Sequence, residues 1–283
     1  MKADLHMHST ASDGEYAPGA LMVRVADAGI TLAALTDHDS LAGVGEAQCA
    51  AKALGVALIP GVELGCGADK EIHILGYGVD PRDEALLRFC DDRRSEREER
   101  ARKMVDQLAQ NGMPISLARV RELARGVIAR PHVARTLVEA GYASSVSDAF
   151  DRYLLPGKCG YVPKRDVKGA KAAQLIHGAG GVAVLAHPMK LKYGDAMLAG
   201  VVREWAAQGL DGIEVYHPSA QNNHVPTLLR LAHELGLLVT GGSDFHGEHV
   251  NPDRKLFGGL DRWTSAQEDT CRLLERIGET LQG

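Results

Sequence analysis

Histidine and carboxylate side chains recur along this chain at positions where they could bind metal ions together. His6 and His8 are two residues apart, and the period of two in a strand places both imidazoles on the same side, where they could bind one cation. Taken alone, the pair is equally well explained as two hydrogen-bonded histidines at a polar strand end. The set as a whole favours a metal site, because further candidates follow: Asp13, Asp37, His38, Asp39, Glu63, His73, His187, His217, Asp244 and His246.

His73 is the candidate with the clearest need for a partner. It stands between Ile72 and Ile74 in an apolar run, where a polar side chain without compensation would be costly to bury. A metal ion would supply that compensation. His177, His224, His233 and His249 have weaker claims, because they fall on predicted helix faces or in a loop, where water can solvate them.

Seven runs rich in apolar and β-branched residues predict the strands that must position these side chains. The runs are 2–6, 31–36, 56–60, 72–75, 182–186, 211–215 and 237–240. Amphipathic segments at 19–28, 41–54, 168–179, 196–208 and 222–235 predict helices between most of them. This alternation predicts an α/β fold with a parallel, closed sheet, a distorted seven-stranded (β/α)7 barrel. In such a barrel the carboxyl ends of the strands converge on one face, and the candidate ligands follow those ends.

The interval 81–166 breaks the alternation of strand and helix. It begins with a charged segment at 91–103 and continues through predicted helices at 117–124, 132–140 and 146–153. We expect it to form an inserted helical cap, with the barrel built from residues 1–80 and 167–283. The charges at 91–103 mix signs at spacings that allow i,i+4 pairs, so this segment is interpreted as a solvated helix face.

Composition and charge exclude several classes of protein. Hydrophobic residues make up 45% of the chain and charged residues 24%, an ordinary globular balance. The formal net charge of −5 argues against coating nucleic acid by bulk electrostatics. The five cysteines are scattered and contain no CxxC pair, which favours reduced thiols. With no apolar run of about 18 residues and no room for a signal peptide before the first strand, we expect a cytoplasmic protein with no membrane contact and no obligate protein partner.

Six features in a fixed order carry a resemblance to a known family. The strings DLHMHSTASDG, LTDHDS, GVEL, AHP and GSDFH, together with the isolated His73, closely resemble the PHP family, named for polymerase and histidinol phosphatase. The resemblance covers nearly the whole chain, including the position of the cap. Within the family, the chain is most similar to the stand-alone phosphoesterases that act on nucleoside 3′,5′-bisphosphates and on short 5′-phosphorylated RNA.

The resemblance implies three metal positions. The first would be held by His6, His8, Glu63 and Asp244, the second by Glu63, His73 and His187, and the third by Asp13, His38 and His246. Asp37 is expected to orient a neighbour rather than to bind metal. Three Mn²⁺ ions are the expected cofactors, mainly by family; Zn²⁺, Fe²⁺ and Mg²⁺ remain alternatives, although a site rich in imidazole disfavours Mg²⁺.

The implied activity is hydrolysis of phosphate monoesters of nucleotides, above all the 3′-phosphate of nucleoside 3′,5′-bisphosphates. Clustered divalent ions can generate hydroxide from water at neutral pH, neutralise phosphoryl oxygens and stabilise the departing alkoxide. No protein nucleophile is then required, so Ser9 and Ser243 are interpreted as hydrogen-bonding residues. His217 could contact the substrate or protonate the leaving group, or it could be hydrogen-bonded and inert.

Basic residues of the cap could decide which phosphate ester is cleaved. Arg130, Arg135 and Lys158 could bind a second phosphate that does not react, with His132 and Lys164 as weaker candidates. Similar PHP phosphatases carry a related RxHxxR string, which favours this role for the two arginines. The alternative for all five residues is ordinary surface charge.

Three other functions remain open at this stage. A histidinol-phosphate phosphatase would share the chemistry, and phosphate-release assays on both compounds would separate the two. A metal-dependent amidohydrolase would share the barrel and the HxH pair, but that architecture commonly bridges its metals with a lysine after strand four, whereas Glu63 takes the bridging role here. A non-catalytic PHP module beside a polymerase is the weakest alternative, because the implied ligands are all present.

Overall fold

Seven strands form one sheet whose spatial order is the order of the sequence. A computed structural model describes residues 2–67, 72–124, 126–220, 224–250, 255–257 and 267–280 of the protein. The strands are β1 (Ala3–Asp4), β2 (Leu32–Leu35), β3 (Ala57–Cys66), β4 (Ile72–Tyr77), β5 (Val182–Leu185), β6 (Gly212–Tyr216) and β7 (Leu238–Gly241). The sheet is nearly closed, because the backbone N–H of Leu5 donates to the carbonyl of Gly241, and Met7 pairs with Phe245. The predicted strands and the distorted barrel are confirmed.

The direction of β4 corrects the prediction of a fully parallel sheet. β4 runs antiparallel to both β3 and β5, whereas the other neighbouring strands are parallel. Only residues 67–71 separate β3 from β4, and parallel neighbours need a crossover of a dozen or more residues. β3 is also longer than the predicted 56–60, so that Glu63 lies within the strand and opposite Leu75 of β4.

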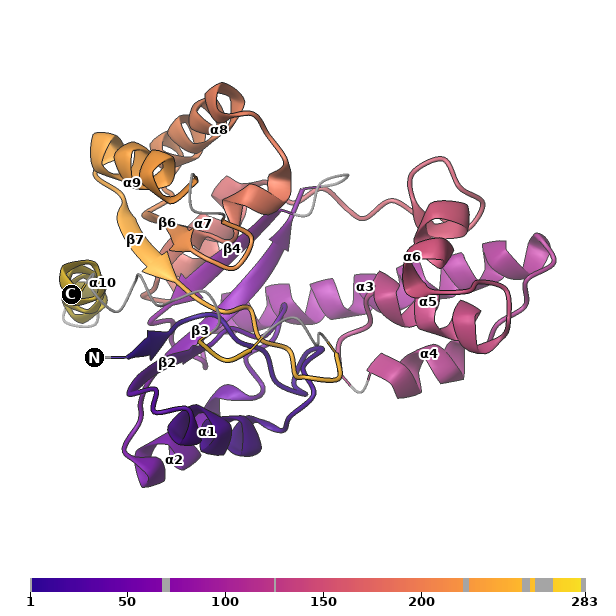
Figure 1. Ribbon diagram of the computed structural model, residues 1–283, viewed down its shortest axis with the longest axis horizontal. Coiled ribbons are helices and arrows are strands. Elements are labelled where there is room, and N and C mark those ends of the chain that lie inside the picture. The colour runs from indigo at the N-terminus through magenta and orange to yellow at the C-terminus, as the bar shows by residue number, and fades with distance from the viewer. Residues whose placement is uncertain are drawn as a thin grey trace.

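Helices cover both sides of the sheet. The barrel helices are α1 (Pro18–Asp27), α2 (Val44–Leu54), α7 (Gly169–Gly178), α8 (Asp195–Ala207), α9 (His224–Leu235) and α10 (Gln267–Thr280). Figure 1 shows α1 and α2 on one side of the strands and α8 and α9 on the other. In α9 the buried residues Val225, Leu228, Leu231 and Ala232 repeat every three or four positions, which gives the helix one apolar face toward the barrel. Residues 222 and 223 of the predicted helix 222–235 lie outside the described residues.

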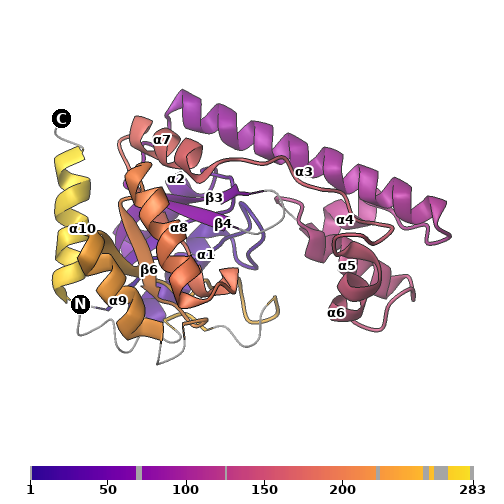
Figure 2. The same ribbon diagram turned by 90° about the horizontal axis from the view of Figure 1, so that it is seen from above.

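The cap is built from α3 (Glu84–Gln110), α4 (Leu117–Ala124), α5 (Arg130–Glu139), α6 (Val146–Ala149) and a π-helical turn at Phe150–Leu154. The side chain of Asp83 accepts a hydrogen bond from the backbone N–H of Leu86 and so begins α3 seven residues before the predicted charged segment. Figure 2 shows α3 running from beside the barrel out along the cap. The cap has an apolar cluster of its own, which includes Met104, Leu108 and Leu137. This separate cluster supports the division at 81–166, which stays a prediction.

No helix within the described ranges is both long enough and apolar enough to cross a membrane. The longest, α3, is strongly charged along its length.

Candidate metal centre

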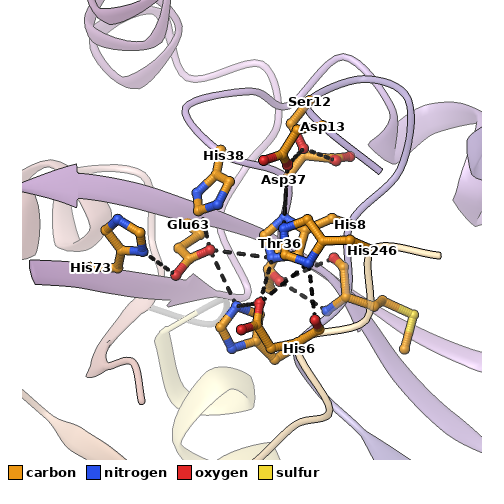
Figure 3. Close-up of polar contacts among 12 residues, drawn as sticks. His6, His8, Ser12, Asp13, Thr36, Asp37, His38, Glu63, His73 and His246 are labelled. Carbon is orange, nitrogen blue, oxygen red and sulfur yellow. Dashed lines mark hydrogen bonds and ion pairs between the residues drawn. The ribbon is translucent and has the colours of Figure 1, made fainter. Parts of the chain in front are cut away.

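His6 and His8 leave the end of β1 side by side and point toward Glu63 (Figure 3). Their Nε2 atoms lie 3.2 and 3.3 Å from Oε2 of Glu63. The same two nitrogens lie 3.6 and 3.4 Å from Oδ1 of Asp244, which follows β7. One donor atom from each of these four residues falls within 4.8 Å of the others, so the first predicted ligand set is compact.

Glu63 stands at the middle of the cluster, with histidines facing both of its oxygens. Oε1 lies 2.8 Å from Nδ1 of His73 and 3.0 Å from Nε2 of His187. Oε2 lies 3.1 Å from Nδ1 of His38. The antiparallel pairing of β3 with β4 brings His73 beside Glu63. The compact group around Glu63 and His73 contains His38, whereas the predicted set contained His187.

Asp13 and His246 form the far side of the cluster. Nε2 of His246 lies 3.4 Å from Oδ1 of Asp13, and the rings of His246 and His8 stack with centroids 3.9 Å apart. Donor atoms of Asp13, His38 and His246 lie within 4.8 Å of one another and of a His8 nitrogen. The third predicted set is therefore brought together, with His8 beside it.

Several buried donor atoms of this cluster make no hydrogen bond to any described residue. They are His6 Nε2, both ring nitrogens of His8, His38 Nδ1, Glu63 Oε2 and His187 Nδ1. Several of these atoms lie close to one another but make no hydrogen bond; buried polar atoms in that state are costly and rare, and a bound cation would satisfy them. Burial alone would raise the pKa of Glu63, but the surrounding histidines outweigh burial and hold that pKa well below its usual value. An anionic carboxylate among imidazoles, without thiolate, suits a divalent metal ion.

Two of the predicted ligands have a backbone conformation that is strained for residues other than glycine. φ is +29° at His187 and +55° at Asp244. Such conformations cost free energy and persist where surrounding contacts enforce them, commonly at functional sites. His187 lies two residues after the end of β5 and Asp244 three residues after the end of β7, so both stand at the carboxyl-terminal ends of strands, where barrel enzymes place their functional residues.

Asp37 binds the loop that carries Asp13 rather than a histidine. Its carboxylate accepts hydrogen bonds from the backbone N–H of Ser9 at 2.8 Å, the Ser9 hydroxyl at 2.7 Å and the Ser12 hydroxyl at 2.5 Å. This agrees with the expected orienting role of Asp37 and the hydrogen-bonding role of Ser9.

His217 lies at the edge of the cluster and is buried. Its Nε2 is 3.4 Å from Oδ2 of Asp244, and its Nδ1 is 2.7 Å from the hydroxyl of Ser219. Burial lowers its pKa. His217 lies beside the predicted ligand Asp244, so its role in the site stays a prediction.

A cavity of about 500 Å³ separates the cluster from the cap. The barrel contributes Asp13, Lys190, Asp244, His246 and Val250 to its lining, and the cap contributes Pro131, His132, Arg135 and Val146. Two of the five predicted cap residues, His132 and Arg135, therefore face the candidate ligands. They are three residues apart on α5, so they share one face of the helix.

The other three predicted cap residues lie elsewhere. Arg130 is five residues from Arg135, which is about 140° around a helix, and it lines a small separate pocket with Arg97 and Arg100. Lys164 donates to the backbone carbonyl of Cys66, and Lys158 is exposed. Among the described residues, neither lysine lines the 500 Å³ cavity.

Glu214 and Lys190 belong to the site but were missed in the sequence. Glu214 is fully buried on β6 and contacts His6, and Lys190 lies 2.5 Å from Oδ2 of Asp244. Glu214 had a usable signal, because it is a charged residue between Ile213 and Val215 in a predicted strand, just as His73 is a polar residue between two isoleucines. Lys190 had none, since a single lysine in a loop is ordinary.

A nearly closed barrel with compact groups of imidazoles and carboxylates is the arrangement expected of metal-dependent hydrolases. A profile of the PHP domain matches residues 4–105. The 5′-3′ exoribonuclease Rnm of Escherichia coli K12 is 37% identical over 283 residues, which cover 96% of this chain and 97% of that protein. The 3′,5′-nucleoside bisphosphate phosphatase of Chromobacterium violaceum is 36% identical over 246 residues, 86% of either chain. A crystal structure from Bifidobacterium adolescentis, assigned as a metal-dependent phosphoesterase, is 32% identical with a TM-score of 0.82, over 98% of this chain and 96% of that one.

The chain belongs to the PHP family of metal-dependent phosphoesterases. It is a hydrolase that acts on phosphoric ester bonds, as the resemblance implied. A divalent metal site is supported by the cluster of histidines and carboxylates.

Proposed function

We propose that this enzyme removes the 3′-phosphate of nucleoside 3′,5′-bisphosphates and also acts on short 5′-phosphorylated RNA. The observation that carries the proposal is the pairing of two walls across one cavity, with the candidate metal ligands on the barrel side and Arg135 with His132 on the cap side. The relatives named for bisphosphate phosphatase and exoribonuclease activity support the same substrate class.

The two walls suit a substrate with two phosphates. The cavity volume of about 500 Å³ is within the usual range for small-ligand sites, about 300–1,000 Å³. A phosphate at the barrel wall would lie among the proposed ligands, and a second phosphate could be bound by the guanidinium fork of Arg135. An ester with one phosphate would leave Arg135 without that partner, so selectivity for a bisphosphate follows.

We propose three Mn²⁺ ions as the cofactors, held by the three predicted ligand sets. When bound, divalent ions supply positive charge that neutralises phosphoryl oxygens and activates water as a nucleophile. The protein's own part is to place three carboxylates, Asp13, Glu63 and Asp244, where they hold this charge, and to orient the ester. Lys190 and Arg135 add cationic groups at opposite walls of the cavity. We further propose a cytoplasmic location, in keeping with the scattered cysteines.

The alternatives make different demands on the site. Histidinol phosphate carries a cationic amine in place of a second phosphate, and the arginine on the cap wall would repel it. An amidohydrolase would be expected to carry a lysine between its metals, whereas the central residue here is Glu63. Both features favour a nucleotide bisphosphate.

Phosphate release by manganese-loaded protein tests the proposal. The substrates are adenosine 3′,5′-bisphosphate, 3′-AMP, 5′-AMP, histidinol phosphate and a short 5′-phosphorylated RNA. We expect the bisphosphate and the RNA to give the highest kcat/KM. A preference for histidinol phosphate would reject the substrate while retaining the phosphoesterase class.

A further inference from the structure

The geometry points to Glu214 as a positioning residue that holds two proposed metal ligands, His6 and His187, with one carboxylate. The inference rests on the metal-binding roles proposed above for these histidines. It assigns a task to a buried acidic residue that the proposed mechanism does not otherwise use.

Glu214 is buried where a carboxylate needs hydrogen bonds and opposite charge to offset the loss of water. It lies on β6 between Ile213 and Val215, and its exposed fraction is 0%. Desolvating a carboxylate costs several kcal/mol unless hydrogen bonds and charge compensate it. The register of β6 against β7 shifts between Glu214 and Tyr216, and irregularities of this kind re-aim a side chain.

The first oxygen of Glu214 fixes the ring of His6. Oε1 lies 2.9 Å from Nδ1 of His6, although β6 and β1 are not neighbours in the sheet. An ionised carboxylate can only accept, so Nδ1 must carry the hydrogen. In the neutral ring that a metal ion requires, Nε2 then keeps its lone pair, and this is the nitrogen that lies 3.2 Å from Oε2 of Glu63 within the first proposed ligand set. A carboxylate on the far nitrogen also makes a ligating imidazole more basic.

The second oxygen of Glu214 holds the turn that presents His187. Oε2 accepts a hydrogen bond of 2.7 Å from the backbone N–H of His187, where φ is +29°. The side chain of His187 continues from this strained turn to place Nε2 3.0 Å from Oε1 of Glu63. The rings of His6 and His187 lie nearly parallel, with centroids 5.7 Å apart. One carboxylate therefore fixes the orientation of two histidines that face the two oxygens of Glu63.

The test compares Glu214→Gln with wild-type protein in the absence of substrate. Zn²⁺ affinity is measured by chelator competition, and the hydrogen on His6 is located by ¹⁵N NMR of Zn²⁺-loaded protein. If the amide nitrogen of the new glutamine side chain faced His6, it would meet the hydrogen on Nδ1, and two donors cannot form a hydrogen bond. We expect Glu214→Gln to fold, to lose about 10- to 100-fold in Zn²⁺ affinity and to lose the single Nδ1–H form of His6.

Asp37→Asn is the matched control, because Asp37 is also buried and hydrogen-bonded but binds the Asp13 loop. It should leave the Nδ1–H signal of His6 unchanged. Glu214→Asp is the second variant, since it keeps the charge but withdraws both oxygens. We expect its Zn²⁺ affinity to lie between those of wild-type protein and Glu214→Gln.

Unchanged Zn²⁺ affinity and an unchanged His6 signal in Glu214→Gln would overturn the inference. Failure of both Glu214 variants to fold would also overturn it, because a purely structural role would then explain the residue. Absence of Zn²⁺ binding by wild-type protein would overturn it as well. None of these readouts uses a phosphate ester. If wild-type protein ignores bisphosphates while the Glu214 variants behave as expected, the substrate proposal fails and this inference stands.

Discussion

Asp39 accepts two hydrogen bonds from Arg97, with Oδ2 3.0 Å from Nε and 2.7 Å from one terminal nitrogen. Arg97 belongs to the cap helix α3, and Asp39 directly follows His38 of the candidate centre. The other oxygen of Asp39 accepts from the backbone N–H of Gly65 on β3 at 3.1 Å. This pair therefore ties the cap to the two segments that carry His38 and Glu63.

Replacement of Arg97 by methionine should destabilise the fold by about 3 kcal/mol at pH 7, because it removes one partner of a largely buried ion pair. Burial would raise the pKa of Asp39, but the guanidinium groups of Arg97 and Arg93 outweigh burial and hold that pKa below its usual value. A carboxyl with a lowered folded pKa contributes stability that is present above its unfolded pKa, about 4, and is lost as the pH falls through the folded value. Urea unfolding at pH 7 and pH 3 should therefore show a smaller difference from wild-type protein at pH 3.

Arg94→Met is the control for that comparison. Arg94 makes an exposed i,i+3 pair with Asp91 on the same helix, and exposed pairs contribute about 0–1 kcal/mol. Equal losses for the Arg94 and Arg97 variants at pH 7 would contradict the proposed tie between cap and barrel.

Asp13→Asn should remove one metal ion per chain and abolish hydrolysis while leaving the fold intact. Asp13 is a ligand of the third proposed set, and its partner His246 lies 3.4 Å away. Elemental analysis of manganese-loaded protein after gel filtration measures the metal content, and circular dichroism reports the fold. Asp151→Asn, at an exposed position of the cap, should keep the full content. Undiminished metal in the Asp13 variant would argue against this ligand.

Arg135→Ala should raise KM for adenosine 3′,5′-bisphosphate by about 10- to 100-fold, the loss of one charge-assisted hydrogen-bonding group. KM for 3′-AMP should change little, because that ester has no second phosphate. Arg130 lines a different pocket, so Arg130→Ala should have the smaller effect. Steady-state kinetics on both substrates decides the matter, and equal losses on the two esters would contradict a cap that senses the second phosphate.

Lys190→Met should lower kcat/KM for every phosphate ester by about 10- to 100-fold, since it removes a cation that contacts Asp244 and lines the cavity. Lys192→Met is the matched control, because Lys192 is exposed and ends the same short 3-10 turn (Pro188–Leu191). The same assays on both variants measure the difference. Wild-type rates in the Lys190 variant would remove this lysine from the site.

Cys66 and Cys90 should not react with a thiol reagent at pH 8 while the protein is folded. Burial raises the pKa of each thiol to about 12, so thiolate is scarce at that pH. Cys49 and Cys271 are exposed and should react quickly. Titration with Ellman's reagent, with and without denaturant, counts the accessible and the buried thiols. Rapid reaction of four or more thiols in native protein would show that at least one of Cys66 and Cys90 is accessible.

The sequence by itself determined the seven strands, the barrel and the cluster of candidate ligands at one end. These features are local: apolar runs predict strands, the period of two puts His6 and His8 on one side, and residues that follow strand ends converge in any such barrel. The isolated His73 was informative for the same reason, because a polar residue in an apolar run needs a partner.

Only the tertiary structure decided how the parts are combined. The hairpin of β3 and β4 reversed one strand and set His73 against Glu63. The rotation of α5 turned Arg135 into the cavity and Arg130 away from it, and the packing of the cap brought Arg135 to the same cavity that Lys190 lines. Glu214 and His6 are 208 residues apart, so their contact arises only when β1 and β6 are folded into one barrel. Contacts of this kind depend on how distant segments pack, which a local sequence pattern does not encode.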